Sequence, residues 1–214
     1  MAEGTRTFTT HDRALADNVQ EMAFKAGLAA DIEEAVEGGR ALYTIQMIDD
    51  EGAEPAIDAA IPGDAITVAA GTYEEQLHIT KNNLVLTGAG MGSTIVRSPL
   101  SLALQFGTAP DQNKPIVFVD GCTGVQLSGL TVDGAGRGNL NYRFQGVAFW
   151  NAGGSLANAA VIGISDTPFS GAQHCVGVYA YNNTSGPYTL AVNNVLVNGF
   201  QKNGLALMGA GLVI

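Results

Sequence analysis

The residues best suited to chemistry gather in and just after a glycine-rich stretch in the middle of the chain. Asp133 begins this stretch, and Arg137, Tyr142, Arg143 and Trp150 follow it closely. An aromatic ring beside a carboxylate and a guanidinium is the combination that a sugar-binding surface needs. The predicted ligand-binding residues are therefore Asp133, Arg137, Tyr142, Arg143, Trp150 and, one repeat later, Asp166, with Asp133 and Arg143 as the two candidates for a catalytic role.

A purely structural role for the same residues is an open alternative. Asp133 is followed by Gly134, which is an ordinary turn pair. Arg143 could simply form an ion pair with Asp133 or Asp166, and Trp150 could belong to the hydrophobic core. The sequence does not choose between a ligand-binding groove and these structural pairings.

Histidines and cysteines form no motif that predicts a metal site. His11, His78 and His174 are scattered along the chain, so neither a metal ion nor a cofactor is expected. His174 directly precedes Cys175, which is a weak indication of a thiol with a neighbouring base. Cys122 and Cys175 both lie beside strand-like apolar segments, so we expect two buried free thiols rather than a disulfide.

The C-terminal half of the chain contains an internal repeat. Its copies begin at Val125, Ser155 and Tyr188, which are 30 and 33 residues apart. Repeats of this length are typical of stacked architectures, in which each copy buries its apolar face against the next. Asn recurs at the corners, where it tolerates a left-handed backbone and can hydrogen-bond to the next copy. The copies are Val125–Gly134 with Gly146–Asn151, Ser155–Thr167 with Cys175–Asn182, and Tyr188–Phe200 with Asn203–Gly209.

Short strand-like segments precede this repeat. They are rich in Val, Ile, Leu and Thr and bounded by Gly and Asn, and they are too short to form hairpins of their own, so they must stack on neighbours. Gly88–Gly92 is a tight turn rather than a phosphate loop, because no Lys-Ser/Thr follows it. The predicted strands are Ala65–Ala70, Gln76–Thr80, Leu84–Thr87 and Ser93–Arg97. Turns are predicted at Gly71–Tyr73 and Lys81–Asn83, and a one-turn helix at Ala56–Ala60. A loop is predicted at Leu100–Pro115, with its tip at 111–113.

The segment from Ala56 to Glu75 carries a family resemblance. Ala56-Ile57-Asp58-Ala59-Ala60, Pro62-Gly63-Asp64, Ile66-Thr67-Val68 and Gly71-Thr72-Tyr73-Glu74-Glu75 resemble the opening turn of right-handed parallel β-helix proteins of the pectin-lyase-like superfamily. The resemblance implies an all-β fold, with a single-stranded right-handed parallel β-helix over residues 56–214 and a small N-terminal α/β appendage over residues 1–55. Binding proteins, lyases, hydrolases and esterases share this opening, so the fold alone assigns no activity.

The resemblance also sets the functional expectations. The leading one is a non-catalytic β-helix scaffold or carbohydrate-contacting module that is extracellular or surface-associated. Lyases of this kind use carboxylates to hold Ca²⁺ and an Arg or Lys as the base, so the alternative is a divergent lyase that acts on acidic polysaccharides through Asp133 and Arg143. Ca²⁺ is expected only under that alternative. The paired carboxylates of the hydrolases and esterases have no counterpart in this sequence.

Residues 1–55 differ in character from the rest. Apolar residues recur at helical spacing from His11 to Ala26, which predicts a helix. A second helical turn is predicted at Asp31–Val36. Apolar and polar residues alternate over Arg40–Ile48, which predicts a strand. We expect the first helix to cover the open N-terminal end of the β-helix, where apolar side chains and unpaired backbone would otherwise be exposed. Residues 8–48 also resemble the trailing part of a LAGLIDADG homing endonuclease or intein domain without its metal-binding motif. A second alternative is therefore a decayed endonuclease tail fused to a β-helix fragment.

Bulk composition narrows the class of partner. Hydrophobic residues make up 46% of the chain and charged residues 14%, with 28 glycines, which predicts a large core and many tight turns. A net charge of −10 disfavours nucleic acid, which needs a basic face. Polysaccharide is the partner that the resemblance implies. No membrane span and no signal-peptide core are expected. The apolar segment Leu212–Ile214 predicts an open last rung, so we expect either a truncated β-helix or one that self-associates through this end.

Overall fold

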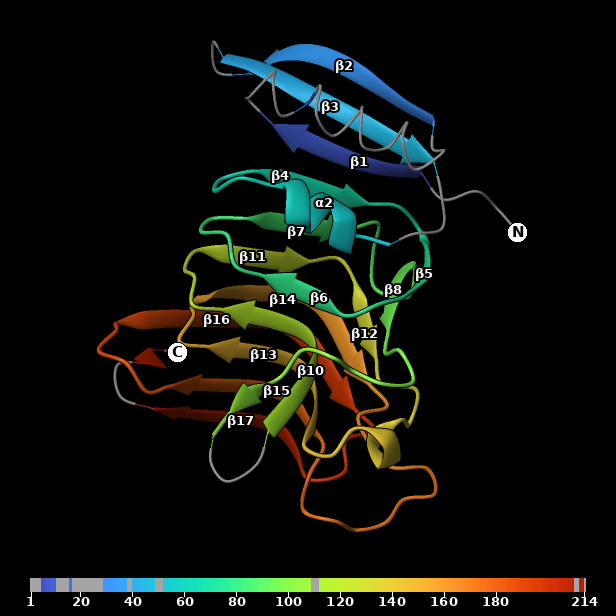
Figure 1. Cartoon of the computed structure of the whole chain (residues 1–214), viewed down its shortest axis with the longest axis vertical. Coiled ribbons are helices and arrows are strands. Elements are labelled where there is room, and N and C mark those ends of the chain that lie inside the picture. Colours follow the sequence, from blue (N-terminus) through green and yellow to red (C-terminus); the bar gives the residue numbers. More distant parts are fainter. Residues whose placement is uncertain are drawn as a thin grey trace.

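A computed structural model describes residues 5–10, 16, 29–37, 40–48, 52–108, 112–209 and 212–213. Figure 1 shows a tall stack of short strands, with the strands of the N-terminal part at one end and β15 and β17 toward the other. The elements are β1 (Thr5–Thr10), β2 (Ala29–Glu37), β3 (Arg40–Ile48), α2 (Glu54–Ala59), β4 (Ala65–Val68), β5 (Gly71–Glu74), β6 (Leu77–Ile79), β7 (Val85–Gly88), β8 (Thr94–Arg97), β9 (Phe106–Gly107), β10 (Gln112–Asp120), β11 (Val125–Ser128), β12 (Thr131–Asp133), the 3₁₀ helix η1 (Gly138–Leu140), β13 (Phe144–Trp150), β14 (Gly154–Ile162), β15 (Val176–Asn182), β16 (Tyr188–Asn198), β17 (Asn203–Gly209) and β18 (Leu212–Val213).

From β4 onward the chain forms a parallel β-helix. Strands of successive turns pair in parallel, β4 with β7, β7 with β11, β11 with β14 and β14 with β16. A second sheet stacks β6, β10, β13, β15 and β17 in the same way. β5, β8 and β12 form a further parallel stack that joins the C-terminal half of β14. The predicted β-helix and the predicted repeat copies are therefore confirmed.

Inward side chains of successive turns align in columns. Leu86 lies opposite Ile66 on one side and Leu127 on the other, and Leu127 lies opposite Leu156. All of these side chains are buried, as is Phe149 in the second sheet. Burying a large apolar side chain stabilises the fold by about 1.5–3 kcal/mol, so each member of these columns contributes to the stability of the β-helix.

Asparagine and glycine form the corner at which β14 and β16 pass from one stack to the next. Asn158 and Asn194 have φ angles of 48° and 51°, in the left-handed region. Asn194 Nδ2 donates to Asn158 Oδ1 at 2.8 Å, so the two corners are hydrogen-bonded across the turns. Gly129 takes the corner one turn earlier, with φ 65°, and its N–H donates to the Asn158 carbonyl at 3.2 Å. The predicted role of asparagine at the corners is confirmed.

The sequence predicts a turn at Gly71–Tyr73, and this prediction is wrong. β5 occupies these residues and pairs with β8, placing Tyr73 opposite Val96. Tyr73 is buried. The segment therefore contributes to the core as a strand, because a neighbouring strand outweighs the local turn preference of its glycine.

The sequence predicts a loop tip at 111–113, and this prediction is wrong for residues 112 and 113. Gln112 and Asn113 begin β10, and they pair antiparallel with Gly107 and Phe106 of β9. The Asn113 side chain is buried, and its Nδ2 donates to the Phe106 carbonyl at 3.2 Å. Because these polar groups are satisfied inside the protein, the segment is ordered as a strand instead of a solvent-exposed tip.

The N-terminal part adds antiparallel strands to the first sheet. β1 pairs with β4 and β3, and β3 pairs with β2 along its whole length. The strand predicted at Arg40–Ile48 is confirmed, whereas the helical turn predicted at Asp31–Val36 is wrong. Two glycines in the sequence, Gly38 and Gly39, separate β2 from β3, a spacing that favours a hairpin. The strand edge of β4 is thereby covered, which limits pairing with other chains.

The helix predicted over residues 11–26 lies outside the described residues except for Ala16. Ala16 is helical and fully buried, and it belongs to the same hydrophobic cluster as Ile57 of α2 and Ile66 of β4. The predicted one-turn helix at Ala56–Ala60 corresponds to α2, which begins two residues earlier.

The last turn of the stack carries exposed apolar side chains. Leu196, Leu205 and Val213 have 54%, 44% and 52% of their surface exposed. β18 pairs with β16 and begins a further turn. No helix in the described part of the chain is long and apolar enough to cross a membrane.

Candidate functional site

Aromatic side chains cover the outer face of the second sheet, which consists of β6, β10, β13, β15 and β17. Val147 and Val178 point into the core, so the residues next to them along each strand point outward. Trp150 stacks on Tyr181, with 5.4 Å between ring centroids and 12° between ring planes. Phe106 of β9 packs on Trp150 at 4.8 Å. The rings of this face are His78, Phe106, Phe118, Trp150, Tyr179 and Tyr181.

Part of this aromatic face is open to solvent. Trp150 lies opposite Tyr181, and Tyr181 lies opposite Met208, in successive strands. The two rings are half-buried and Met208 is exposed. We call Trp150, Tyr181 and Met208 the outer file. Such a file of flat and flexible apolar side chains gives an elongated ligand a surface on which to pack.

A pocket of about 330 Å³ opens beside the outer file. Met208 belongs to both, and Arg143 and Lys202 bring positive charge to the lining. Tyr142, at the rim, is 58% exposed. The pocket is lined by Asn113, Tyr142, Arg143, Phe144, Gln145, Gln173, His174, Cys175, Val176, Tyr179, Lys202, Asn203, Ala206 and Met208.

Polar contacts fix the side chains at the base of this pocket. Arg143 donates from Nε to Asn113 Oδ1 and from Nη2 to Thr108 Oγ1, both at 3.1 Å. Gln145 is buried, and its Nε2 donates to the same Asn113 oxygen at 2.8 Å. Gln145 Oε1 is buried without a hydrogen-bond partner in the described part of the chain. A buried acceptor without a donor costs about 1–3 kcal/mol, so a ligand hydroxyl that donated to this oxygen would gain that energy.

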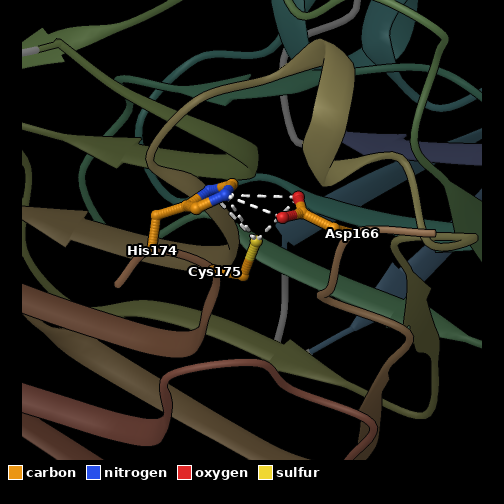
Figure 2. A group of neighbouring side chains, drawn as sticks. All are labelled: Asp166, His174 and Cys175. Carbon is orange, nitrogen blue, oxygen red and sulfur yellow. Dashed lines mark hydrogen bonds and ion pairs between the residues drawn. The ribbon is translucent and has the colours of Figure 1, made fainter. Parts of the chain in front are cut away.

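A compact cluster of Asp166, His174 and Cys175 lies behind the pocket, and Figure 2 shows the three side chains pointing toward one another. His174 Nε2 lies 3.2 Å from Asp166 Oδ1, and His174 Nδ1 lies 3.2 Å from Cys175 Sγ. All three residues are buried. His174 and Cys175 line the pocket, whereas Asp166 stands behind them.

Asp166 lies in the loop after β14, and hydrogen bonds from this loop and from the turn between β16 and β17 hold it in place. Ser170 Oγ donates to Asp166 Oδ2, and Gln201 Nε2 donates to the same oxygen at 3.0 Å. Burial alone would raise the pKa of Asp166, but the hydrogen bonds from Ser170 and Gln201 and the neighbouring His174 outweigh it and lower the pKa. Asp166 is therefore a carboxylate, and its Oδ1 remains directed at His174 and Cys175.

The resting thiol of Cys175 is neutral. Burial, followed by the charge of Asp166, raises the pKa of Cys175 to about 12. A cysteine nucleophile reacts as the thiolate, so this geometry without a further positive charge is poorly suited to thiol catalysis. The second cysteine, Cys122, has its pKa raised to about 11, chiefly by burial. Both cysteines are free and buried, as predicted.

The structure places the predicted site residues in two separate groups. Asp133 Oδ2 forms an ion pair with Arg97 at 3.1 Å, and Arg137 forms one with Glu74 at 3.0 Å. Both pairs lie along β5, β8 and β12, away from the second sheet. Arg143 donates to Asn113 of β10 and to Thr108 in the loop before β10. Tyr142 and Arg143 line the pocket, Trp150 lies in the outer file and Asp166 supports His174.

Sequence reasoning missed several residues of this face. Gln145, Lys202 and Asn203 carry no motif, and only their position at the start of aligned strands identifies them. The scattered histidines predict no metal site, whereas the fold brings atoms of Asp166, His174 and Cys175 within 4.8 Å of one another. No protein-family model matches this chain, and no significant match was found among curated proteins or solved structures.

Proposed function

We propose that this chain is a non-catalytic β-helix module that binds an acidic polysaccharide on the outer face of its second sheet. The observation that carries the proposal is the outer file of Trp150, Tyr181 and Met208, which leads into a pocket containing Arg143 and Lys202. Aromatic rings pack on the apolar faces of sugar rings, and cationic side chains bind carboxylates.

The charge distribution favours an acidic ligand. The chain as a whole carries a net charge of −10, yet Arg143 and Lys202 are the charged side chains in the lining of this pocket. A uronate carboxylate would be attracted to the pocket and repelled by the rest of the surface. Binding should therefore depend on which sugar unit of the glycan lies at the pocket.

The polar lining favours a ligand rich in hydroxyl groups. Gln145 Oε1 can accept a hydrogen bond, and the amide of Asn203 can donate and accept. A sugar hydroxyl that donates to Gln145 Oε1 would satisfy a buried acceptor that has no partner in the described part of the chain. Hydroxyls and carboxylates together are the chemistry of an acidic polysaccharide.

The resemblance of residues 56–75 to the pectin-lyase-like superfamily points the same way. Members of that superfamily bind polysaccharides along a sheet of the β-helix, and the pocket described above lies on such a sheet. We therefore propose that this chain belongs to that superfamily. We also propose that it is located outside the cell or on its surface.

The lyase alternative has less support. A lyase of this type would need carboxylates that hold Ca²⁺ beside an arginine base. Asp133 is engaged by Arg97 and by the N–H of Ala135, and Arg143 is held by Asn113 and Thr108. These contacts favour binding over proton abstraction.

A binding assay with defined oligosaccharides tests the proposal. Isothermal titration of the full chain with oligouronates and with neutral oligosaccharides of equal length should show binding to the acidic series. Lys202→Ala should weaken that binding about tenfold, because a charged hydrogen bond contributes about 1.5 kcal/mol. Tyr181→Ala should weaken binding to a similar extent through lost stacking.

Lys81→Ala is the matched control, since Lys81 lies in the turn between β6 and β7 and does not line the pocket. It should bind like the unmodified chain. The proposal fails if no acidic oligosaccharide binds, or if Lys202→Ala and Tyr181→Ala bind as tightly as Lys81→Ala. Release of unsaturated uronate products would instead establish the lyase.

A further inference from the structure

Three potential metal ligands from two segments form a triangle of suitable size for a metal ion. Cys175 Sγ lies 3.9 Å from His174 Nε2 and 4.0 Å from Asp166 Oδ1, and those two atoms are 3.2 Å apart. Cys175 Sγ also lies 3.2 Å from His174 Nδ1, and one ligand atom from each of the three residues lies within 4.8 Å of the others. Zinc binds sulfur at about 2.3 Å, imidazole nitrogen at about 2.0–2.1 Å and carboxylate oxygen at about 2.0–2.2 Å.

We propose that Asp166, His174 and Cys175 bind a zinc ion. One thiolate, one imidazole and one carboxylate make a mixed donor set that suits zinc better than Ca²⁺ or Mg²⁺, which prefer oxygen ligands only. The proposal rests on atoms outside the outer file, although His174 and Cys175 line the same pocket.

The surroundings of the cluster support three ligands in fixed positions. Ser170 Oγ and Gln201 Nε2 both donate to Asp166 Oδ2, which leaves Oδ1 directed at the other two ligands. Outer hydrogen bonds of this kind orient metal ligands and strengthen binding. The ring of Tyr142 packs over His174 with 5.1 Å between centroids, which restricts rotation of the imidazole.

The backbone of Gly138 packs closely against the cluster. A Cβ atom on Gly138 would lie 2.5 Å from Asp166 Oδ1 and 2.8 Å from Cys175 Sγ. Any side chain at this position would therefore press against two of the three ligands. Gly138 lies in η1, and its N–H donates to the Ser165 carbonyl at 2.9 Å, which holds its backbone close to the cluster.

Two of the three proposed ligands face the pocket. His174 and Cys175 line the pocket that also contains Lys202 and Asn203. Three protein ligands with an open fourth position are typical of zinc sites that bind water or a small ligand, whereas structural zinc sites use four protein ligands. We therefore expect the fourth ligand to be a water molecule or an anionic group of a molecule in the pocket.

Cobalt titration of the reduced, chelator-treated full chain tests the proposal. Co²⁺ replaces Zn²⁺ in such sites and has visible bands that report tetrahedral geometry and an ultraviolet band that reports a bond to thiolate. One equivalent of Co²⁺ should produce both sets of bands, and one equivalent of Zn²⁺ should remove them. Absence of the thiolate band with excess Co²⁺ would overturn the proposal.

Variants identify the ligands. Cys175→Ser should abolish the thiolate band, while Cys122→Ser should retain it, because Cys122 is a buried free thiol outside the cluster. Loss of the band in Cys122→Ser with retention in Cys175→Ser would place the metal elsewhere and refute the assignment. Gln201→Ala should weaken Zn²⁺ binding by about 10–100-fold, because it removes a hydrogen bond to the ligating carboxylate.

A measurement on the unmodified chain covers the case in which Cys175→Ser does not fold. X-ray absorption at the zinc edge of the Zn²⁺-loaded protein should show one sulfur at about 2.3 Å and nitrogen or oxygen ligands at about 2.0–2.2 Å. A spectrum with no sulfur ligand, or with two, would overturn the proposal.

Discussion

Glu54 should make the stability of this protein fall between mildly acidic and neutral pH. It is the first residue of α2, and its Oε2 accepts the backbone N–H of His78 at 2.9 Å. Burial is the main reason that the pKa of Glu54 rises from 4.5 to about 7. The nearby charges of Asp58 and Glu75 raise it further, whereas the hydrogen bond from His78 partly offsets the rise.

The size of the effect follows from this pKa difference. Each pKa unit corresponds to 1.36 kcal/mol, so a rise from 4.5 to about 7 has an upper limit of about 3 kcal/mol. Glu54 is only partly buried, so screening by solvent reduces the expected effect to about 1–2 kcal/mol. Because the pKa is higher in the folded state, this stability is fully present below about pH 4.5 and is lost as the pH rises through about 7.

Glu54→Gln isolates this contribution, since glutamine resembles the protonated acid and its oxygen can still accept the His78 N–H. Urea unfolding of the variant and the unmodified chain should give equal free energies of unfolding at pH 4. At pH 8 the variant should be more stable by about 1–2 kcal/mol. Titrating groups that do not interact with Glu54 cancel in the difference between the two proteins, whereas Asp58 and Glu75 are coupled to it. If the difference does not grow between pH 4 and pH 8, or if the unmodified chain gains stability relative to the variant, the burial argument for Glu54 is wrong.

Two further predictions concern the columns and corners of the β-helix. Phe149→Ala should lower the free energy of unfolding, measured by urea unfolding, by about 3–5 kcal/mol, because Phe149 is fully buried in the second sheet. A loss below about 1 kcal/mol would show that the neighbouring side chains can fill the cavity left by the ring. Asn158→Ala should cost about 2 kcal/mol in the same assay, whereas Asn158→Gly should cost less, because glycine keeps the left-handed backbone and loses only the hydrogen bond from Asn194. Equal losses for both substitutions would contradict the backbone argument.

Much of the β-helix could be predicted because each of its signals is local or periodic. Short apolar segments such as Leu84–Thr87 are bounded by turn residues, and corners such as Asn158 recur with the repeat. The predictions that were wrong depend on pairing partners that are distant in the sequence. Residues 71–73 form a strand only because β8 lies beside them, and Asp31–Val36 is extended because β3 pairs along its length. Local preference cannot reveal such partners.

The candidate site was less predictable because its residues are brought together by the fold at one corner and form no sequence motif. The sequence groups Asp133 with Arg143, since only a few residues separate them. The fold sends them to different sheets, because η1 and the turn after it carry the chain from β12 to β13. Asp133 then meets Arg97 of the preceding turn, whereas Arg143 meets Asn113. In a stacked fold the neighbours of a side chain are one repeat away.

The pocket occupies one recurring position of the stack, immediately before the strands of the second sheet. Arg143 precedes β13, Cys175 precedes β15 and Lys202 precedes β17. Arg143 and Cys175 have φ angles of 57° and 70°, although neither is glycine or asparagine, and such backbone costs roughly 1–2 kcal/mol per residue. Most other left-handed positions in the described part of the chain are Asn or Gly, as at Asn158, although Ala135 also has a φ angle of 51°. Both side chains line the pocket, so this corner is where the proposed glycan and the proposed zinc ion can be tested together.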